Sequence, residues 1–362
     1  MDDKVVQKTL SVIVPTYNER ENIRPLIERI NKAFPQGGYE VVFVDDNSKD
    51  GTAEAIKALK DYPVKLLVRK DKRGLASAVV DGVALADAPV IGVIDADLQH
   101  PPEVLPKLLE SINAGADIAI ASRYVPGGDC RGWSTTRRII SKGAIMLAHL
   151  LLPSTRKVHD PMSGYFMSRK QSIDMTRLKP TGFKILLEML VVGGARQTAE
   201  VPYVFDVRSR GESKLSSKTQ VDYLKHLWSL FVRTGELLRF LKFIFVGLTG
   251  VGVNLGLLWL LAEKGNVVDW LSSGVAIEVS IIWNFILNNA FTFRDRNIPG
   301  IGPFIKRLLK FNAVSLPGWA INFGVSLFFR DVVHLDKILA QALGIIPATL
   351  WNYILNMVWT WR

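Results

Sequence analysis

The sequence predicts an α/β domain with a doubly wound, mainly parallel sheet, followed by an all-α membrane domain of four helices. From residue 10 to residue 121, short β-branched runs alternate with helical stretches, and three of the runs end in polar residues. Four later segments are apolar over the roughly 20 residues that are needed to cross a bilayer. We therefore place the α/β domain at 1–219, an interfacial amphipathic helix or linker at 220–239, and the membrane domain at 240–362.

The first domain is expected to contain five strands and four helices. The strands are Leu10–Val14, Val41–Val44, Val64–Val68, Val90–Ile94 and Asp117–Ala121. The helices between them are Arg20–Ala33, Thr52–Leu59, Leu75–Ala86 and Pro102–Asn113. Ligands of such sheets bind beyond the carboxyl ends of the strands. The residues directly after each strand are therefore the candidate functional residues.

Charge and cysteine content narrow the possible partners. The formal net charge of +11 favours nucleic acid, an anionic bilayer surface or a phosphorylated small molecule. No recognised nucleic-acid-binding motif occurs, and basic residues beside the apolar segments account for much of the excess, so we expect no nucleic-acid partner. The single cysteine, Cys130, excludes an intramolecular disulfide and a multi-cysteine zinc site.

An acidic loop follows the fourth strand. Asp95 and Asp97 stand just past a buried run and Gln99 follows them, which supplies hard oxygen ligands suited to Mg²⁺ or Mn²⁺. A divalent ion there would neutralise a nucleotide diphosphate. A single Asp-x-Asp pair could instead form an Asx-turn at the end of a strand. Because three strands of the same domain end in polar residues, a metal and nucleotide site is favoured. Because Pro15 to Glu19 replace any Rossmann glycine fingerprint or phosphate loop after the first strand, a dehydrogenase or ordinary ATPase is disfavoured.

Four strings carry a family resemblance: Val12-Ile-Val-Pro-Thr-Tyr-Asn-Glu19, Val44-Asp-Asp-Asn-Ser48 with Asp50-Gly-Thr52, Arg73-Gly74, and Asp95-Ala-Asp97. On these strings, the first two thirds of the chain resemble the inverting, nucleotide-sugar-dependent glycosyltransferases of family 2, which have the Rossmann-like GT-A fold. The resemblance implies that a set of residues contacts the nucleotide sugar: Pro15, Tyr17, Glu19, Val44, Asp45, Asp46, Asp95, Ala96, Asp97, Arg208 and Lys214. It also implies that Asp95, Asp97 and Gln99 serve the metal and the diphosphate.

Further strings look like those of dolichyl-phosphate mannose synthases: Ser122-Arg-Tyr124, Gly132-Trp133, Arg137-Arg-Ile-Ile-Ser-Lys-Gly143, Asp160-Pro-Met-Ser-Gly-Tyr-Phe166, and Arg208 with Gly211-Glu-Ser-Lys-Leu215. Since arginine binds phosphate bidentately, we expect a cluster to hold an acceptor phosphate: Arg123, Arg137, Arg138, Ser141 and Lys142. A solvated basic face is the alternative. Arg208 and Lys214 lie in a Gly- and Ser-rich loop that either closes over the donor diphosphate or is a flexible linker.

The expected reaction is the inverting transfer of mannose from GDP-mannose to dolichyl or polyprenyl phosphate. A phosphate monoester is largely ionised near neutral pH, since its second pKa is about 6, so it attacks without a general base. Asp95, Asp97 and Arg123 are the expected catalytic residues, acting through alignment and electrostatics. Two alternatives stay open. One is a polyprenyl-phosphate glucosyltransferase that uses UDP-glucose, and the other is a lipid carrier or flippase whose first domain binds nucleotide sugars without turnover.

The four expected spans are Phe240–Ala262, Trp270–Phe293, Leu309–Phe329 and Ile338–Trp361. Trp283-Asn-Phe-Ile-Leu-Asn288 recurs 68 residues later as Trp351-Asn-Tyr-Ile-Leu-Asn356, which predicts two parallel helical-hairpin repeats. The pattern resembles the GtrA-like, four-helix membrane proteins associated with polyprenyl-linked sugar transfer. Several residues are polar at membrane depth, which suggests helix contacts or a headgroup path: Asn254, Glu278, Asn284, Asn288, Asn322 and Asn352.

The basic residues of the membrane domain gather on one side of the expected hairpins. They are Arg239, Lys242, Arg294, Arg296, Lys306, Arg307, Lys310 and Arg362. The positive-inside rule then predicts that the first domain faces the cytoplasm, at the endoplasmic reticulum or a prokaryotic plasma membrane. The sequence leaves the oligomeric state and the preferred metal open.

Overall fold

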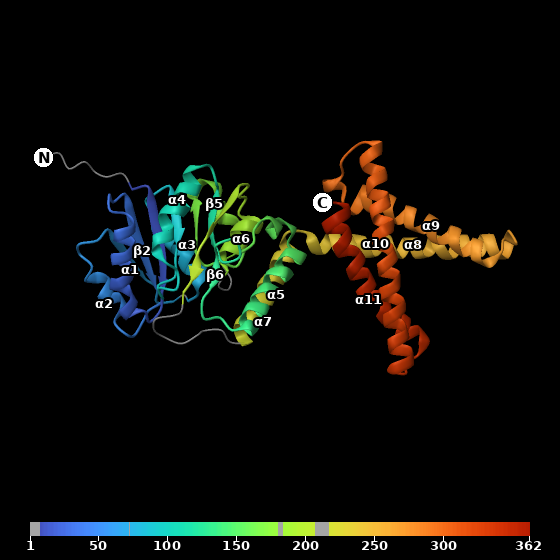
Figure 1. The fold of residues 1–362 in the computed structure, drawn as a ribbon, viewed down its shortest axis with the longest axis horizontal. Coiled ribbons are helices and arrows are strands. Elements are labelled where there is room, and N and C mark those ends of the chain that lie inside the picture. Colours follow the sequence, from blue (N-terminus) through green and yellow to red (C-terminus); the bar gives the residue numbers. More distant parts are fainter. Residues whose placement is uncertain (1–7, 72, 180–183, 207–216) are drawn as a thin grey trace. The chain divides into compact units, whose positions relative to one another are not determined.

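The computed structural model describes residues 8–71, 73–179, 184–206 and 217–362 (Figure 1). The chain divides into two compact units, Met1–Thr234 and Gly235–Arg362. The first is an α/β unit and the second is all-helical, as the sequence predicts. The boundary between the units falls within the segment 220–239, for which a linker or interfacial helix is predicted.

The α/β unit contains a seven-stranded sheet in the order β3-β2-β1-β4-β7-β5-β8. Its strands are β1 Leu10–Thr16, β2 Tyr39–Asp45, β3 Val64–Val68, β4 Val90–Val93, β5 Ile118–Ser122, β7 Phe166–Arg169 and β8 Thr198–Pro202. β7 runs antiparallel to β4 and β5, and all other neighbours in this sheet are parallel. The carboxyl ends of the parallel strands therefore share one edge. A short parallel pair, β6 Asp129–Cys130 and β9 Val204–Phe205, lies beyond β5 and β8 in sequence.

Helices cover both faces of the sheet. The helices of this unit are α1 Arg20–Ala33, α2 Thr52–Lys57, α3 Leu75–Leu85, α4 Leu105–Asn113, α5 Thr135–Leu151, α6 Ile185–Val192 and α7 Ser217–Arg233, with 3-10 turns at Pro102–Val104, Pro153–Lys157, Lys170–Ser172 and Met175–Arg177. On one face, Leu26 of α1 and Leu108 of α4 pack in a cluster with Val12. On the other, Val79 of α3 and Leu186 of α6 pack with Ile13. The alternation of buried residues along β1 thus builds two cores, one on each face.

Helices α5 and α7 pack together through Ile145 and Leu227, and the Tyr223 hydroxyl donates to the Ala144 carbonyl at 2.7 Å. α7 is held to α6 by Glu188, which accepts from the Arg233 guanidinium at 2.9 Å and lies 3.1 Å from Nε2 of His226. The pair still leaves large apolar side chains exposed: Ile139, Ile140, Met146, Val221, Leu224, Trp228 and Val232. We call this set the α5–α7 apolar surface.

The helical unit consists of two hairpins, α8 beside α9 and α10 beside α11 (Figure 1). The helices are α8 Glu236–Trp259, α9 Asp269–Leu287, α10 Ile301–Leu327 and α11 Lys337–Leu355, with a 3-10 turn at Arg294–Arg296. Each ends in a five-residue π turn: Leu260–Lys264, Asn288–Thr292, Phe328–Val332 and Asn356–Thr360. These turns lie 68 residues apart in the two hairpins, which supports the repeat.

Among the residues that the structure describes, three segments are long and apolar enough to cross a membrane: Glu236–Lys264, Asp269–Thr292 and Lys337–Thr360. α10 is also long, but it is not among them, so its crossing stays a prediction. Its amino-terminal half carries Lys306, Arg307 and Lys310, which lower its apolar character.

Glycines and asparagines form matching contacts in the two hairpins. A Cβ on Gly250 would collide with Asn284 Oδ1, and a Cβ on Gly318 would collide with Asn352 Oδ1. Both asparagines, predicted to be polar at membrane depth, therefore lie at close helix crossings where only glycine fits. The hairpins meet in an aromatic cluster, where Phe293 stacks on Trp361 with ring centroids 4.4 Å apart.

Candidate active site

The loops after β1 and β2 are tied to each other at the carboxyl edge of the sheet. The buried Asp45 carboxylate accepts from the Thr16 hydroxyl at 3.0 Å and from the Ser48 hydroxyl at 2.6 Å. The backbone N–H of Asn18 donates to Ser48 Oγ at 2.8 Å. Asn18 and Asn47 have φ values of 55° and 58°, a left-handed conformation that asparagine tolerates. Asp45, predicted to contact the nucleoside, thus also shapes the loop that would receive it.

Asp46 has a comparable internal role. Its carboxylate forms an ion pair with Arg69 and accepts from the backbone N–H of Gly74 at 2.9 Å. Beside Gly74, the Arg73 guanidinium lies 5.4 Å from the ring centre of Tyr17, which is 37% exposed. An exposed aromatic ring with a cation over it is suited to stack on a base and to neutralise phosphate charge.

The remaining residues predicted to bind the nucleotide lie in the same region. Pro15 and Val44 are partners in the register of β1 and β2, and the Val44 side chain is fully buried. A substrate contact from Val44 would therefore come from its backbone. The backbone N–H of Glu19 donates to Thr52 Oγ1 at 3.0 Å. Ala96 is buried within the acidic loop.

The acidic loop after β4 fits a divalent cation. The Gln99 amide donates to the Asp206 carbonyl at 3.0 Å, which leaves its oxygen as a potential ligand beside the carboxylates of Asp95 and Asp97. Gly164 leaves room opposite them, because a Cβ there would lie 3.2 Å from Asp95 Oδ2. Among the described residues, no group of three or more His, Cys, Asp or Glu side chains could hold a metal. Further ligands would therefore be diphosphate oxygens and water, as is usual for Mg²⁺.

His100 lies beneath this loop and was not singled out from the sequence. Its ring packs against those of Tyr165, Tyr203 and Phe205. Burial lowers the pKa of His100 to about 4, so the imidazole is neutral at pH 7. Its Nδ1 accepts from the Asp95 backbone N–H at 3.4 Å. The neutral ring thus acts as an acceptor that holds the backbone of the acidic loop at Asp95.

Arg123, at the end of β5, is fixed by a buried ion pair. Its Nε and Nη2 atoms donate to Asp160 at 2.7 and 2.8 Å, and its backbone N–H donates to the same carboxylate at 3.1 Å. Burial lowers the pKa of Arg123, but Asp160 outweighs this and raises it. Glu200 on β8 accepts from the backbone N–H of Asp160 at 3.1 Å, which fixes the loop in turn. Nη1 is the guanidinium nitrogen outside the pair with Asp160.

An indole ring links Arg123 to helix α5. The guanidinium carbons of Arg123 and Arg137 lie 5.3 and 4.1 Å from the ring centre of Trp133. Ser141, one turn further along α5, accepts from the Tyr124 hydroxyl at 2.8 Å, and the Arg123 guanidinium lies 5.5 Å from the Tyr124 ring. The structure therefore brings three of the five predicted phosphate-binding residues into one neighbourhood.

The other two residues of that cluster lie differently. Arg138 pairs with Asp129 at 3.2 Å and donates to the Cys130 carbonyl at 2.7 Å, so it fastens α5 to β6. Lys142 is exposed. Two predicted donor-binding residues lie outside the described residues: Arg208 and Lys214.

Lys184, at the start of α6, is a candidate that sequence reasoning missed. Its ammonium donates to the Met162 carbonyl at 2.7 Å. Burial and the Arg123 guanidinium lower the pKa of Lys184 to about 8, against the raising influence of Asp160 and Asp95. No local pattern marks this lysine, because the groups around it come from distant parts of the chain.

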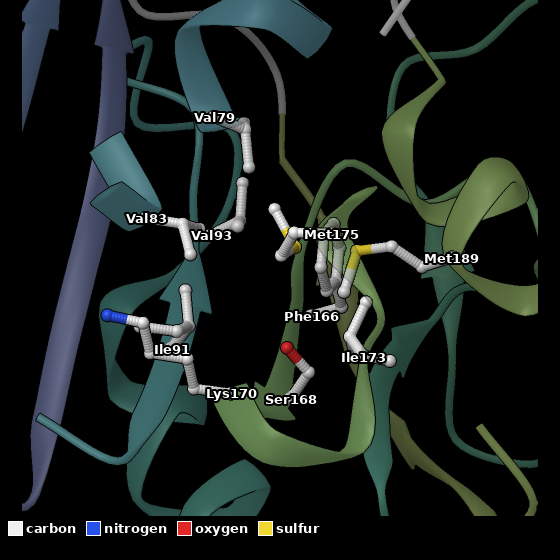
Figure 2. A pocket seen from close by; sticks show the side chains of 10 residues that line it. All are labelled: Val79, Val83, Ile91, Val93, Phe166, Ser168, Lys170, Ile173, Met175 and Met189. Atoms are coloured by element: carbon white, nitrogen blue, oxygen red, sulfur yellow. The ribbon is translucent and has the colours of Figure 1, made fainter. Parts of the chain in front are cut away.

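A small apolar hollow lies elsewhere in the α/β unit, between α3, β4, β7 and α6 (Figure 2). Its lining residues are Val79, Val83, Ile91, Val93, Phe166, Ser168, Lys170, Ile173, Met175 and Met189. None is a predicted site residue, and the Lys170 ammonium donates to the Ala86 carbonyl at 3.1 Å. The hollow is therefore a gap in core packing, and the polar strand ends remain the candidate site.

Comparisons with known proteins agree with both units. Residues 11–175 match the family described as glycosyl transferase family 2, and residues 242–361 match the family described as GtrA/DPMS, transmembrane domain. The chain is 45% identical to a dolichol-phosphate mannosyltransferase of Pyrococcus furiosus, over 97% of this chain and 99% of that protein. A protein of the same name from Saccharomyces cerevisiae is 42% identical, over 61% of this chain and 86% of its own length. A solved structure, glucosyl-3-phosphoglycerate synthase of Mycobacterium tuberculosis, has a TM-score of 0.49 at 19% identity and covers 62% of this chain and 80% of its own.

Proposed function

The chain belongs to glycosyl transferase family 2, among the dolichol-phosphate mannosyltransferases that carry a GtrA/DPMS transmembrane domain, and on this basis we propose that it transfers mannose from GDP-mannose to dolichyl or polyprenyl phosphate. The observation that carries the proposal is that the loop containing Asp160 and Gly164 contacts both groups of site residues. Asp160 forms a hydrogen-bonded ion pair with Arg123, and Gly164 lies next to the Asp95 carboxylate. The acidic loop and the arginine cluster are thereby brought to the same edge of the sheet.

The donor is proposed to lie along the loops after β1, β2 and β4. The Tyr17 ring and Arg73 would face the nucleoside, and the Asp95 and Asp97 carboxylates with Gln99 would hold Mg²⁺ or Mn²⁺ against the diphosphate. Such an ion stabilises the negative charge that develops on the departing GDP.

The acceptor phosphate is proposed to lie between Arg123, Arg137 and Ser141. One of its oxygens forms a bond to the anomeric carbon while the bond from that carbon to the GDP oxygen breaks, which inverts an α-linked donor to a β-linked product. No proton has to leave the nucleophile, because the phosphate is already ionised. Arg123 therefore acts by orienting the phosphate, and Asp160 keeps the guanidinium in place.

The lipid part of the acceptor requires contact with a bilayer. The helical unit makes the chain a membrane protein. The α5–α7 apolar surface, which includes Ile139, Met146 and Trp228, is proposed to lie in the membrane interface. This would hold Ser141 and Arg137, on the same helix α5, at the depth of lipid phosphates.

The basic residues at one end of the hairpins support a cytoplasmic position for the α/β unit. A test replaces the buried Cys130 by serine and introduces single cysteines at the exposed Lys142 and, at the other end, Lys264. In sealed right-side-out vesicles, a membrane-impermeant maleimide is expected to label position 264 only. Labelling of position 142 in intact vesicles would reverse the orientation.

The decisive experiment supplies purified protein with dolichyl phosphate and either radiolabelled GDP-mannose or UDP-glucose. We expect a mannosylated lipid from GDP-mannose. Product from UDP-glucose alone would replace the proposal by a glucosyltransferase. Binding of a nucleotide sugar without product from either donor would favour a carrier.

A further inference from the structure

Two buried donors beside Arg123 lack hydrogen-bond partners. Within the part of the chain that the structure describes, the Tyr203 hydroxyl and the Trp133 indole N–H are buried without a partner. The Arg123 guanidinium carbon lies 5.3 Å from the ring centre of Trp133 and 5.8 Å from that of Phe205, and the Tyr203 ring centre lies 6.4 Å from that of Phe205. Both rings pack edge-on against Phe205. Since buried donors are nearly always paired in folded proteins, two such groups beside one cation indicate a place for an acceptor atom.

The Tyr203 side chain is held in a fixed position. Its backbone N–H donates to the Ser122 carbonyl at 3.1 Å, and its carbonyl accepts from the Asp129 N–H at 3.1 Å. Its ring centre lies 5.7 Å from those of both His100 and Tyr165. Burial raises the pKa of Tyr203, so the hydroxyl keeps its proton and can donate. A fixed, protonated and unpaired hydroxyl is pre-organised to bind an anion.

We propose that the Tyr203 hydroxyl and the Trp133 N–H donate to oxygens of the acceptor phosphate monoester. This inference rests on the proposed function. Asp160 occupies two guanidinium nitrogens of Arg123, so the arginine alone offers little to the several lone pairs of a phosphate. The neutral Tyr203 and Trp133 donors add hydrogen bonds without adding positive charge. Further positive charge would stabilise the phosphate nucleophile before reaction more than in the transition state, and so slow its attack.

The test is Tyr203→Phe, with Tyr165→Phe as the matched control. Both tyrosines are buried in one aromatic cluster, but the Tyr165 hydroxyl donates to the Pro101 carbonyl at 3.0 Å. Because one hydrogen bond to a charged group is lost, we expect Tyr203→Phe to lower kcat/KM for dolichyl phosphate by about 10- to 100-fold. The KM for GDP-mannose stays unchanged. Thermal stability without substrate stays equal or rises, since an unpaired buried hydroxyl is removed.

The control is expected to show the opposite pattern. Tyr165→Phe loses a buried hydrogen bond and leaves the Pro101 carbonyl with the Val104 N–H as its remaining partner, so its melting temperature falls while kcat/KM for dolichyl phosphate stays near that of the wild type. Trp133→Phe keeps a ring beside both arginines and removes the N–H. It is expected to weaken the use of dolichyl phosphate in the same way as Tyr203→Phe.

Direct binding separates this inference from the proposed function. The dissociation constants of dolichyl phosphate and of dolichol are measured without any nucleotide sugar. Tyr203→Phe is expected to weaken binding of the phosphate ester about 10- to 100-fold and to leave dolichol unaffected. Unchanged binding of dolichyl phosphate, or a higher KM for GDP-mannose alone, would overturn the assignment of Tyr203. A wild type that binds dolichyl phosphate but transfers no mannose would refute the proposed reaction, while the binding comparison still decides the role of Tyr203.

Discussion

Replacing Asp160 by asparagine removes the negative charge from the best-buried ion pair of the candidate site. Asp160 is 0% exposed and the Arg123 side chain is 8% exposed, and three hydrogen bonds join the two residues. The asparagine keeps the shape but places an uncharged amide against the guanidinium. Arg123 is then a buried cation without its counter-ion. Breaking a buried pair from one side costs about 3–5 kcal/mol.

A second pair of similar geometry serves as the control. Glu103 accepts from Nε and Nη2 of Arg29 at 2.9 and 2.7 Å, but the two side chains are 53% and 37% exposed. Water screens this pair, so Glu103→Gln is expected to cost at most about 1 kcal/mol. The two substitutions therefore differ in burial and hardly in chemistry.

The comparison uses the full chain in detergent, with a urea titration followed by a brief protease pulse that digests only the unfolded α/β unit. Asp160→Asn should move the midpoint strongly to lower urea and lower mannosyl transfer, whereas Glu103→Gln should move the midpoint only slightly and leave transfer unchanged. Equal midpoints for both variants would refute the view that burial makes the Arg123 pair important.

Three further outcomes are expected. Asp97→Ala abolishes transfer, and EDTA does the same to the wild type until Mg²⁺ or Mn²⁺ is returned; undiminished turnover would disprove the metal role. Burial raises the pKa of Glu188, but hydrogen bonds from α7 outweigh this and hold it below 4.5, so its stabilising contribution is complete above about pH 4.5 and is lost at lower pH. Urea midpoints at pH 7 and pH 4 should therefore differ less in Glu188→Gln than in the wild type. Gly250→Ala places a Cβ against Asn284 and lowers the melting temperature, whereas Gly252→Ala, with nothing within 4 Å, does not, and equal losses would contradict the close crossing.

The local pattern predicted the strands β1 to β5 and the helices α1 to α4 closely, whereas β6 to β9 were not predicted. α1 has the predicted bounds of Arg20 and Ala33, and the polar strand ends lie at one edge of the sheet. β7 was missed, since an antiparallel strand between two parallel ones depends on distant pairing that no local period records. The resemblance to glycosyl transferase family 2 was recognised from short sequence motifs, which lie in the loops at the carboxyl edge of the sheet.

The sequence could not predict which side chains of the candidate site pair with each other. Arg123 was predicted as a phosphate ligand, but its pairing with Asp160 depends on a loop 37 residues away in the chain. Arg138 has the same residue type and helix as Arg137, yet it is directed to Asp129 while Arg137 lies over Trp133. Arg137 and Arg138 are adjacent in the helix and therefore point in different directions around its axis. A cluster of basic residues in a sequence does not show which of them faces a substrate. Their roles at the acceptor stay predictions.

The aromatic junction of the helical unit has a consequence for how the enzyme responds to its membrane. The contacts described between the hairpins, including the Phe293 and Trp361 stack, lie at the end of the helices that carries the basic residues. Only 11–22% of each of the three apolar spans is buried, so a surrounding bilayer would contact most of their surface. We therefore expect hydrophobic mismatch in a thicker or thinner bilayer to change the angle between the two hairpins, while each helix keeps its helical turns.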